Sequence, residues 1–237
     1  DDRHTFKNGL HFGVTASVAD DKTEVTKWTY NTKIPSYGAT GWWDKSAYKE
    51  GMVLGDIWGL QFDRFLTEDD FNADGSLKAG LPDQTKVFPA GYQFAPGDVL
   101  YKDLDNNGEI VKQTNTNDKG DLSVIGNALP RLQFGLNLDA AWKGFDISMF
   151  FQGVAKRKLW AAGNQVLPGF TTGEPFYKGA EDYWTPENTD AFYPRPMDYK
   201  QSASGNYSVN DRYLLNMAYL RLKTFTVGYS LPKVWLS

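Results

Sequence analysis

Strict alternation of apolar and polar residues is the feature that most constrains how this chain can fold. From Arg131 to Trp142 apolar residues occupy every second position, and after Lys143 and Gly144 the same period continues to Gln152. Successive side chains of a β-strand point to opposite faces, so both segments are predicted to be two-faced strands. A two-residue turn at Lys143 and Gly144 would close them into an antiparallel hairpin.

The same period recurs near both ends of the chain. Its apolar positions are Leu10, Phe12, Val14, Ala16 and Val18 in the first run, and Phe225, Val227, Tyr229 and Leu231 in the last. These runs approach or exceed the length of about nine to eleven residues that a tilted strand needs to cross a bilayer. A weaker strand is expected over residues 52–62. Segments 30–51, 66–97 and 155–210 are rich in Gly, Pro, Asn, Asp and Tyr, and such long loops are uncommon unless they are functional.

Two architectures explain strict alternation. One is an antiparallel sheet of a soluble protein, with one face on a core. The other is an outer-membrane barrel, in which apolar side chains face lipid, polar side chains face the lumen, and short turns alternate with long loops. Trp142 and Phe145 flank the expected turn, a position that suits an aromatic girdle at a membrane interface and also a hydrophobic cluster at the end of a sandwich. The period alone leaves both architectures open.

Composition excludes several function classes. The net charge is −4 and there is no run of Lys or Arg, so the basic surface needed for nucleic-acid binding is missing. The absence of Cys removes disulfides and thiolate metal sites, and with histidine only at His4 and His11, histidine catalysis and zinc sites are nearly excluded. The mean hydropathy of −0.50 does not exclude a membrane location, because barrel strands are apolar only at alternate positions.

No catalytic motif is found in the sequence. It contains no G-x-S-x-G, no H-E-x-x-H and no glycine-rich phosphate loop, and acidic pairs such as Glu181 and Asp182 are too common to indicate glycoside hydrolysis. The first ten residues lack the regions of a signal peptide, and no apolar run approaches the length of a membrane-spanning helix. We expect that the chain is not an enzyme.

Five phrases carry a resemblance to a known family. They are "VLGDIWGLQFDRF" (53–65), "PGDVLYKDLDNNGEI" (96–110), "VIGNALPRLQFGLNLDAAWKGFDISMFFQGVA" (124–155), "YWTPENTDAFYPRP" (183–196) and "NDRYLLNMAYLRLKTFTVGYSLPKVWL" (210–236). In this order they resemble the C-terminal part of the SusC/RagA family of TonB-dependent outer-membrane transporters of Bacteroidetes. They extend over nearly the whole chain.

The resemblance implies a fold, a location and partners. The fold would be all-β, an antiparallel transmembrane β-barrel segment with long extracellular loops, and residues 1–237 would be the C-terminal portion of a plugged barrel whose plug and final strands lie outside this chain. The family imports glycans or peptides across the outer membrane, with energy supplied by TonB through the plug and with a SusD-like lipoprotein over the extracellular mouth. Outer-membrane lipid would surround the barrel.

The expected number of strands also indicates that this chain is a segment of a larger barrel. The alternating runs amount to roughly five to seven strands, too few for a closed barrel with loops of this length. An open sheet edge cannot face lipid, because its backbone hydrogen-bonding groups would be unsatisfied. Further strands are therefore expected from outside this chain.

The phrase "YKDLDNNGEI" is a candidate calcium loop. Asp103, Asp105 and Asn107 take the first, third and fifth positions of an EF-hand-type loop, and Gly108 takes the sixth. Thr114 stands where such a loop needs a bidentate Glu, and Asp118 could replace that ligand only in a wider loop. The alternative is an Asx-rich turn in which Asn107 and Gly108 supply positive φ angles.

Aromatic residues in the long segments are candidate substrate contacts. Trp42 and Trp43 cluster with Tyr37 and Tyr48 in one segment, and a second cluster contains Trp160, Tyr177, Tyr183 and Trp184. In extracellular loops the four Trp side chains could stack on sugar rings. Alternatively, the aromatic residues pack the loops themselves or form part of an interface with the lipoprotein. Polar residues of the strands, namely Arg131, Gln133, Asn137 and Asp139, are expected to face the lumen.

A function of a different class is a secreted, calcium-dependent, carbohydrate-binding β-sandwich. It would use the same alternation to cover a soluble core and the same acidic loop to hold calcium. A glycan is the default substrate of the transporter hypothesis, and a peptide is its alternative.

Overall fold

The computed structural model describes residues 2–27, 50–112, 119–161, 163, 165–169, 177–197 and 205–232. These residues form antiparallel β-sheets, and their helical turns include the 3-10 turns η2 (Glu68–Asp70) and η3 (Lys178–Ala180). The chain divides into two compact units. Unit 1 comprises Asp1–Thr23, Leu129–Lys158 and Asn216–Ser237, and unit 2 comprises Glu24–Ala128 and Leu159–Leu215. The prediction of an all-β fold is confirmed.

Within the described ranges, no helix has the length and apolar character needed to cross a membrane.

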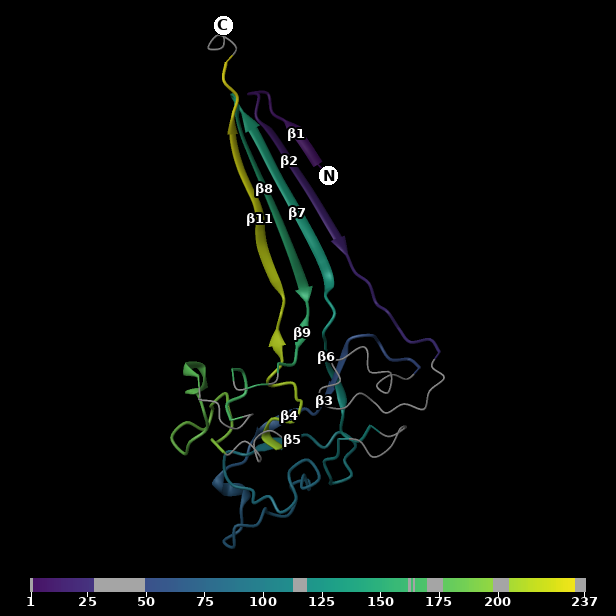
Figure 1. Ribbon diagram of the computed structural model, residues 1–237, viewed down its shortest axis with the longest axis vertical. Helices are drawn as coiled ribbons and strands as arrows, with labels where there is room; N and C mark the ends of the chain where they lie inside the picture. Colours follow the sequence, from purple (N-terminus) through teal and green to yellow (C-terminus); the bar gives the residue numbers. More distant parts are fainter. Residues whose placement is uncertain are drawn as a thin grey trace. The chain divides into compact units, whose positions relative to one another are not determined.

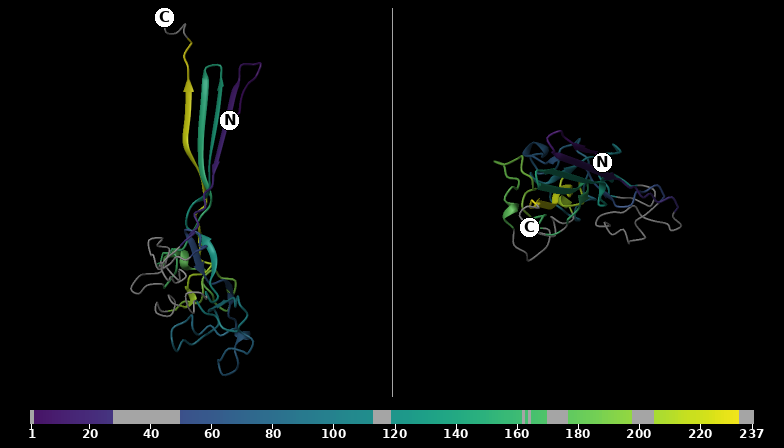
Figure 2. Two further views of the ribbon diagram at one scale, coloured as in Figure 1. Left: turned by 90° about the vertical axis from the view of Figure 1, so that its right-hand side faces the viewer. Right: turned by 90° about the horizontal axis from the view of Figure 1, so that it is seen from above.

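Unit 1 is a five-stranded antiparallel sheet with the order β1-β2-β7-β8-β11. Its strands are β1 (Asp2–Thr5), β2 (His11–Ala19), β7 (Arg131–Trp142), β8 (Phe145–Lys156) and β11 (Tyr219–Tyr229). The two longest strands have 12 residues each. In the views of Figures 1 and 2 the strands β2, β7, β8 and β11 run alongside one another as long ribbons, with the short β1 beside β2. The three alternating regions of the sequence therefore meet in one sheet.

The hairpin at the centre of this sheet has the predicted two-residue turn. Trp142 is paired with Phe145, and Lys143 and Gly144 have φ angles of 48° and 86°. Two successive residues with positive φ match a type I′ turn, whose twist suits that of the flanking strands. The carbonyl of Gly144 also accepts a hydrogen bond of 2.7 Å from the Ser230 N–H, which joins the turn to the end of β11.

Cross-strand pairing places the apolar residues of four strands on one face. The paired residues on that face include Val14 with Leu138, Leu138 with Met149, Leu136 with Phe151, Met149 with Phe225, and Ile147 with Val227. The large side chains at its edges are strongly exposed, with values of 73% for Val18, 58% for Phe225 and 61% for Val227. The described residues therefore leave this apolar face uncovered.

A β-bulge in β11 keeps its apolar residues on that face. Leu220 and Leu222 occupy even positions, whereas the following apolar residues, Phe225 and Val227, occupy odd positions. The pairing with β8 shifts between Leu222 and Thr224, so that Lys223 is the extra residue. An extra residue reverses the alternation of faces, and here it cancels the change in the sequence pattern.

A second irregularity lies where β7 begins. Leu132 has a φ angle of 52°, which is unusual for a residue other than glycine. The Asp20 carboxylate accepts a hydrogen bond of 3.0 Å from the Leu132 N–H and forms an ion pair with the neighbouring Arg131. Asp20 thus holds a backbone conformation that costs about 1–2 kcal/mol for a side-chain-bearing residue.

Unit 2 consists of short strand pairs and long connecting segments. Strand β3 (Asp56–Gly59) pairs with β6 (Ser123–Asn127), and β4 (Phe62–Phe65) pairs with β5 (Val99–Tyr101). A further pair of the chain, at the sequence boundaries of the two units, is formed by the two-residue strands β9 (Lys158–Leu159) and β10 (Leu215–Asn216). The single strand expected over residues 52–62 is wrong, because the chain breaks between β3 and β4, where the Leu60 N–H donates to the carbonyl of Val209.

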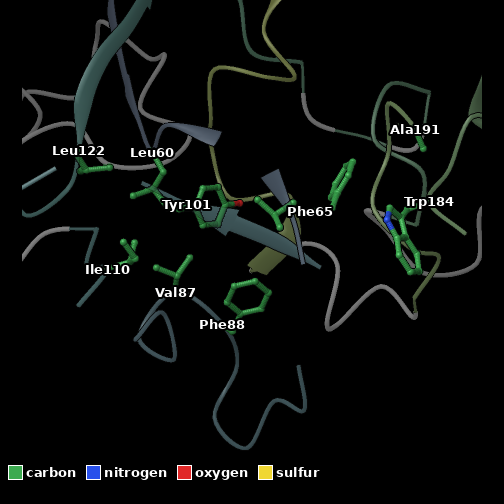
Figure 3. Close-up of a cluster of buried hydrophobic side chains, with 10 residues drawn as sticks. Leu60, Phe65, Val87, Phe88, Tyr101, Ile110, Leu122, Trp184 and Ala191 are labelled. Atoms are coloured by element: carbon green, nitrogen blue, oxygen red, sulfur yellow. The ribbon is translucent and has the colours of Figure 1, made fainter. Parts of the chain in front are cut away.

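Two hydrophobic clusters form the core of unit 2. The first surrounds Tyr101 and contains Leu60, Phe65, Val87, Phe88, Val99, Ile110, Leu122, Trp184 and Ala191 (Figure 3). The second contains Ile57, Trp160, Leu167, Tyr207, Val209 and Tyr213. In the first cluster the Tyr101 hydroxyl donates to the carbonyl of Gly205 at 2.8 Å, so residues far apart in the sequence are joined in the core.

Buried polar side chains complete the hydrogen bonding of β5. The Gln84 side chain donates to the carbonyl of Val99 at 2.7 Å and accepts from the Tyr101 N–H at 3.2 Å. The Asn206 amide oxygen accepts from the Val99 N–H at 2.7 Å. Both amides are fully buried, and they take the place of a neighbouring strand.

Candidate functional site

Unit 2 contains a cavity of about 430 Å³, within the size range of small-ligand sites. Its described lining consists of four tyrosines and three prolines, together with three residues at or beside η3; these are Tyr177, Tyr183, Tyr193, Tyr207, Pro168, Pro194, Pro196, Lys178, Ala180 and Glu181. All come from the segment between β9 and β10. We call this the tyrosine–proline cavity.

One wall of the cavity is built by backbone pairing within the phrase "YWTPENTDAFYPRP". The Tyr193 N–H donates to the carbonyl of Asp182 at 2.9 Å, and the Trp184 N–H donates to the carbonyl of Tyr193 at 3.0 Å. The turn between these segments is closed by the Asn188 N–H, which donates to the carbonyl of Thr185. These bonds bring Tyr183 and Tyr193 side by side as a parallel bridge, with Pro194 directly after it.

The inner side of the cavity is formed by stacked tyrosines. The ring of Tyr193 is stacked on Tyr213, with centroids 6.0 Å apart and planes 11° apart, and Tyr207 meets Tyr213 edge-on at 5.3 Å. Tyr207 is only 2% exposed, and no described residue forms a hydrogen bond with its hydroxyl. Burial raises the pKa of both Tyr193 and Tyr207, so their hydroxyls stay protonated as potential donors.

The outer side is more open. The rings of Tyr177 and Tyr183 are 43% and 41% exposed, and Lys178 and Glu181 add one charge of each sign. Tyrosine offers both an apolar face and a hydroxyl. The arrangement therefore suits a neutral ligand that has an apolar surface and a few hydrogen-bonding groups.

Two of the tryptophans predicted to contact substrate, Trp160 and Trp184, are instead buried in the hydrophobic clusters of unit 2. Trp160 is 8% exposed in the second cluster, and Trp184 is 6% exposed in the first. A Cβ added to Gly97 would lie 2.5 Å from the Trp184 ring, which shows how closely the backbone packs there. These positions match packing within the loops, which the sequence left open as the alternative. Trp42 and Trp43 lie outside the described residues, and a substrate role for the four tryptophans stays a prediction.

The acidic loop brings a third carboxylate to two of the predicted residues. Asp103 and Asp105 are joined by Asp121, and ligand oxygens of the three lie within 4.8 Å of one another. The Asn107 amide oxygen accepts a hydrogen bond of 2.7 Å from the Glu109 N–H. Asp118, considered as a replacement ligand, lies outside the described residues.

The same carboxylates hold the loop in shape. Asp103 accepts from the Gly108 N–H at 2.7 Å, and the buried Asp121 accepts from the N–H groups of Leu104 and Val111 at 2.8 Å each. The positive φ angles belong to Asn106 and Gly108, at 58° and 85°. The expected Asx-rich turn is present, with the Asn107 N–H bonded to Asp105 and the Glu109 N–H bonded to Asn107, but the expected positive φ is right for Gly108 and wrong for Asn107.

The negative charges of the acidic loop repel one another. Partial desolvation and the negative charge of Asp121 raise the pKa of Asp105. Partial desolvation acts in the same direction on Asp103, but hydrogen bonds from Gly108 and its neighbours outweigh it and lower the pKa of that carboxyl. A cation would relieve this repulsion, and calcium at Asp103, Asp105 and Asn107 stays a prediction.

The polar face of the unit 1 sheet contains the residues expected to face a lumen. Asn137 is paired with Thr15, and Asp139 with Gly13 and Ser148. The Asp139 carboxylate lies directly over Gly13, where an added Cβ would be 2.6 Å from its oxygens. The alternation predicted for this strand therefore places its polar side chains together on one face.

Comparisons with known proteins agree with this fold. No protein-family profile matches the chain. It is 28% identical over 194 residues to TonB-dependent receptor P3 of Formosa agariphila, covering 79% of this chain and 16% of that receptor. It is 34% identical over 132 residues to TonB-dependent receptor P26 of the same organism, covering 54% of this chain and 12% of the receptor.

A solved structure of the RagAB peptide transporter has the same fold. Its TM-score is 0.60 at 14% identity, over 99% of this chain and 22% of the transporter chain. This chain thus spans less than a fifth of the length of the two receptors. The matched proteins are named as receptors or a transporter, in agreement with the expectation that the chain is not an enzyme.

Proposed function

We propose that this chain, which is SusC/RagA-like TonB-dependent receptor sequence, takes part in nutrient import across the outer membrane. The cargo would be a glycan oligosaccharide or a peptide, and TonB would supply the energy. A SusD-like lipoprotein would be the partner at the cell surface. The sequence resemblance and the names of the matched proteins support this proposal.

The observation that carries the proposal is the uncovered apolar face of the unit 1 sheet. Its large side chains alternate with polar residues along every long strand, and several are more than half exposed. In water such a face would cost about 25 cal/mol for each Å² left uncovered. Lipid is the solvent in which this arrangement is favourable, with the polar residues turned to the inside of a barrel.

Aromatic residues near the turns support the same placement. Trp142, Phe145 and Tyr229 lie together at the β7–β8 turn, where Phe145 and Tyr229 have ring centroids 4.4 Å apart. The Trp142 indole N–H donates to the carbonyl of Asn8 in the β1–β2 turn at 3.3 Å. Tyrosine and tryptophan are enriched at membrane–water interfaces. We place these turns at one membrane surface.

The long connections of the sheet run from β2 to β7 and from β8 to β11, and each begins and ends at the strand ends away from the β7–β8 turn. In outer-membrane barrels the long connections are extracellular and the short turns periplasmic. This topology supports an extracellular tyrosine–proline cavity, which could meet cargo or the lipoprotein.

The alternative of a secreted β-sandwich requires a second sheet over the apolar face of unit 1. The exposed fractions of Val18, Phe225 and Val227 show that no described residue provides this cover. The acidic loop is compatible with either function. The transporter is therefore the better-supported function.

Fractionation of cells that produce the protein containing this chain tests the proposal. We expect the protein in the outer-membrane fraction, soluble only in detergent, and copurifying with a surface lipoprotein. Labelled oligosaccharides and peptides should enter these cells only when TonB is present. Recovery as a soluble monomer without a partner would contradict the proposal.

A further inference from the structure

We propose that the tyrosine–proline cavity is a binding site for an extended, proline-containing peptide segment. The ligand class is inferred from the residues that line the cavity. The inference rests on the proposed import function only in treating such a peptide as cargo. Binding itself would be a property of unit 2.

The lining has few groups that could satisfy a sugar. Its charged side chains are Lys178 and Glu181, and its described lining includes no Asn, Gln, Asp or Arg. A sugar ring has a hydroxyl on most of its carbons, and each one buried without a partner costs free energy. A proline ring has no donor and packs by its apolar surface, which aromatic and proline side chains provide.

The tyrosine hydroxyls match the needs of an extended peptide backbone. A polyproline II segment has no internal hydrogen bonds, so its carbonyls need donors from the site. Tyr207 is 98% buried, lines the cavity, and has a hydroxyl without a hydrogen-bond partner among the described residues. A hydroxyl on the cavity lining could donate to a peptide carbonyl that enters the cavity.

The outer residues are arranged for a ring that enters between aromatic walls. Tyr177 and Tyr183 have exposed rings at the opening, whereas Tyr193 is fixed from behind by its stack on Tyr213. Lys178 and Glu181 give the opening no net charge. Grooves lined by aromatic residues bind proline-rich segments in this way, because the ligand is already extended and loses little entropy.

Calorimetry with the detergent-purified protein that contains this chain tests the inference. The probes are a capped oligoproline peptide and a neutral maltooligosaccharide. We expect the peptide to bind and the oligosaccharide not to bind. Tyr183→Ala should weaken peptide binding about tenfold by removing a wall, and Tyr207→Phe roughly fivefold by removing one donor.

Two controls separate binding from folding. Glu187→Ala changes an exposed residue outside the cavity lining and should leave the affinity unchanged. Tyr207→Phe should also leave Tm unchanged, because no described residue bonds to the hydroxyl. A drop in Tm with unchanged peptide affinity would mean that the hydroxyl serves folding, and would overturn the inference.

The remaining outcomes are also decisive. Binding of the oligosaccharide in place of the peptide, lost in Tyr183→Ala, would make the cavity a glycan site and overturn the inference. Binding of neither probe would overturn it as well. Peptide binding without import into cells would contradict the proposed function and leave the inference standing. Import into cells without peptide binding would overturn the inference and leave the proposed function standing.

Discussion

The two units of this chain use apolar residues in opposite ways. In unit 1 the large apolar side chains point outward from a sheet of long strands, and the backbone ladder holds the strands together. In unit 2 the apolar residues point inward, and buried polar side chains join short strands to distant segments. Unit 1 therefore exposes its apolar residues, whereas unit 2 buries them. In unit 1 this follows from strict alternation along long strands, a period that the short strands of unit 2 do not sustain.

The largest expected effect is in the buried polar network of unit 2. Asp98 is fully buried and accepts from Arg195 at 2.8 Å, from Asn206 at 3.0 Å and from the Ala95 N–H at 2.9 Å. Asp98→Ala would leave the half-buried guanidinium unpaired and should lower the free energy of unfolding of unit 2 by about 3–5 kcal/mol.

Hydrogen exchange resolved by peptide measures this loss in each unit separately. We expect faster exchange across unit 2 and little change in the β7–β8 hairpin. Asp190→Ala is the matched control, because Asp190 is exposed. Equal loosening of both units would show that their stabilities are coupled, contrary to the comparison above.

The next effect concerns the two faces of β11. Phe225 lies on the apolar face opposite Met149, and its neighbour Thr226 lies on the polar face opposite Ser148. Phe225→Arg should cost about 2–4 kcal/mol in a bilayer, because the charge would face lipid. Thr226→Arg is the control and should cost much less. The measurement is denaturant titration of the protein refolded into lipid vesicles, and equal costs would contradict a lipid-facing side.

A smaller effect is expected from acid. Arg64 binds both oxygens of Asp70, at 2.6 and 2.7 Å, and its hydrogen bonds lower the pKa of Asp70 from 3.8 to about 2. Because the folded pKa is depressed, the stabilisation is complete above about pH 4 and is lost as the pH falls toward 2. We expect a loss of about 1–2 kcal/mol, after allowing for screening at the partly exposed Arg64.

Unfolding experiments between pH 5 and pH 2 measure this loss. In Asp70→Asn the part of the pH dependence due to this pair should disappear, with lower stability at neutral pH. An unchanged acid profile in the variant would show that Arg64 and Asp70 do not stabilise the folded state.

The smallest effect is expected in the acidic loop. Neutralising Asp105 removes a repulsion with Asp121, so Asp105→Asn should raise Tm slightly at neutral pH without calcium. If calcium binds there, its addition should raise the Tm of the unchanged protein more than that of the variant. An equal change of Tm in the two proteins on addition of calcium would show that the loop is a turn and that Asp105 does not bind calcium. Asp74→Asn, in another exposed turn, serves as the control.

Local periodicity was enough to predict much of unit 1. The β7–β8 hairpin follows from alternation and from a Lys-Gly turn, both of which are properties of neighbouring residues. The bulge at Lys223 was missed, although the change from even to odd apolar positions after Leu222 is visible in the sequence. In the partner strand β8 the apolar residues alternate without a break, so β11 needs the extra residue to keep its own apolar residues opposite them.

Unit 2 and its cavity were harder to predict, because they depend on residues far apart in the sequence. Gln84 bonds to β5 through its side chain, and no local pattern marks such a role. Tyr177 and Tyr183 belonged to a predicted aromatic cluster, but Tyr193 and Tyr207 did not. Asp121 was missed in the acidic loop because it lies beyond the motif. The sequence signal available for Asp121 was a single acidic residue shortly before the apolar segment that forms β6.

The amide side chains along β5 have a consequence for association with other molecules. An exposed strand edge can recruit a strand from another chain, which is a route to aggregation. Here Gln84 and Asn206 occupy the hydrogen-bonding groups of Val99 and Tyr101, and each amide comes from the same molecule. The edge of β5 is thus closed to intermolecular pairing without a further strand, which allows long loops to contain short strands without exposing their backbone edges.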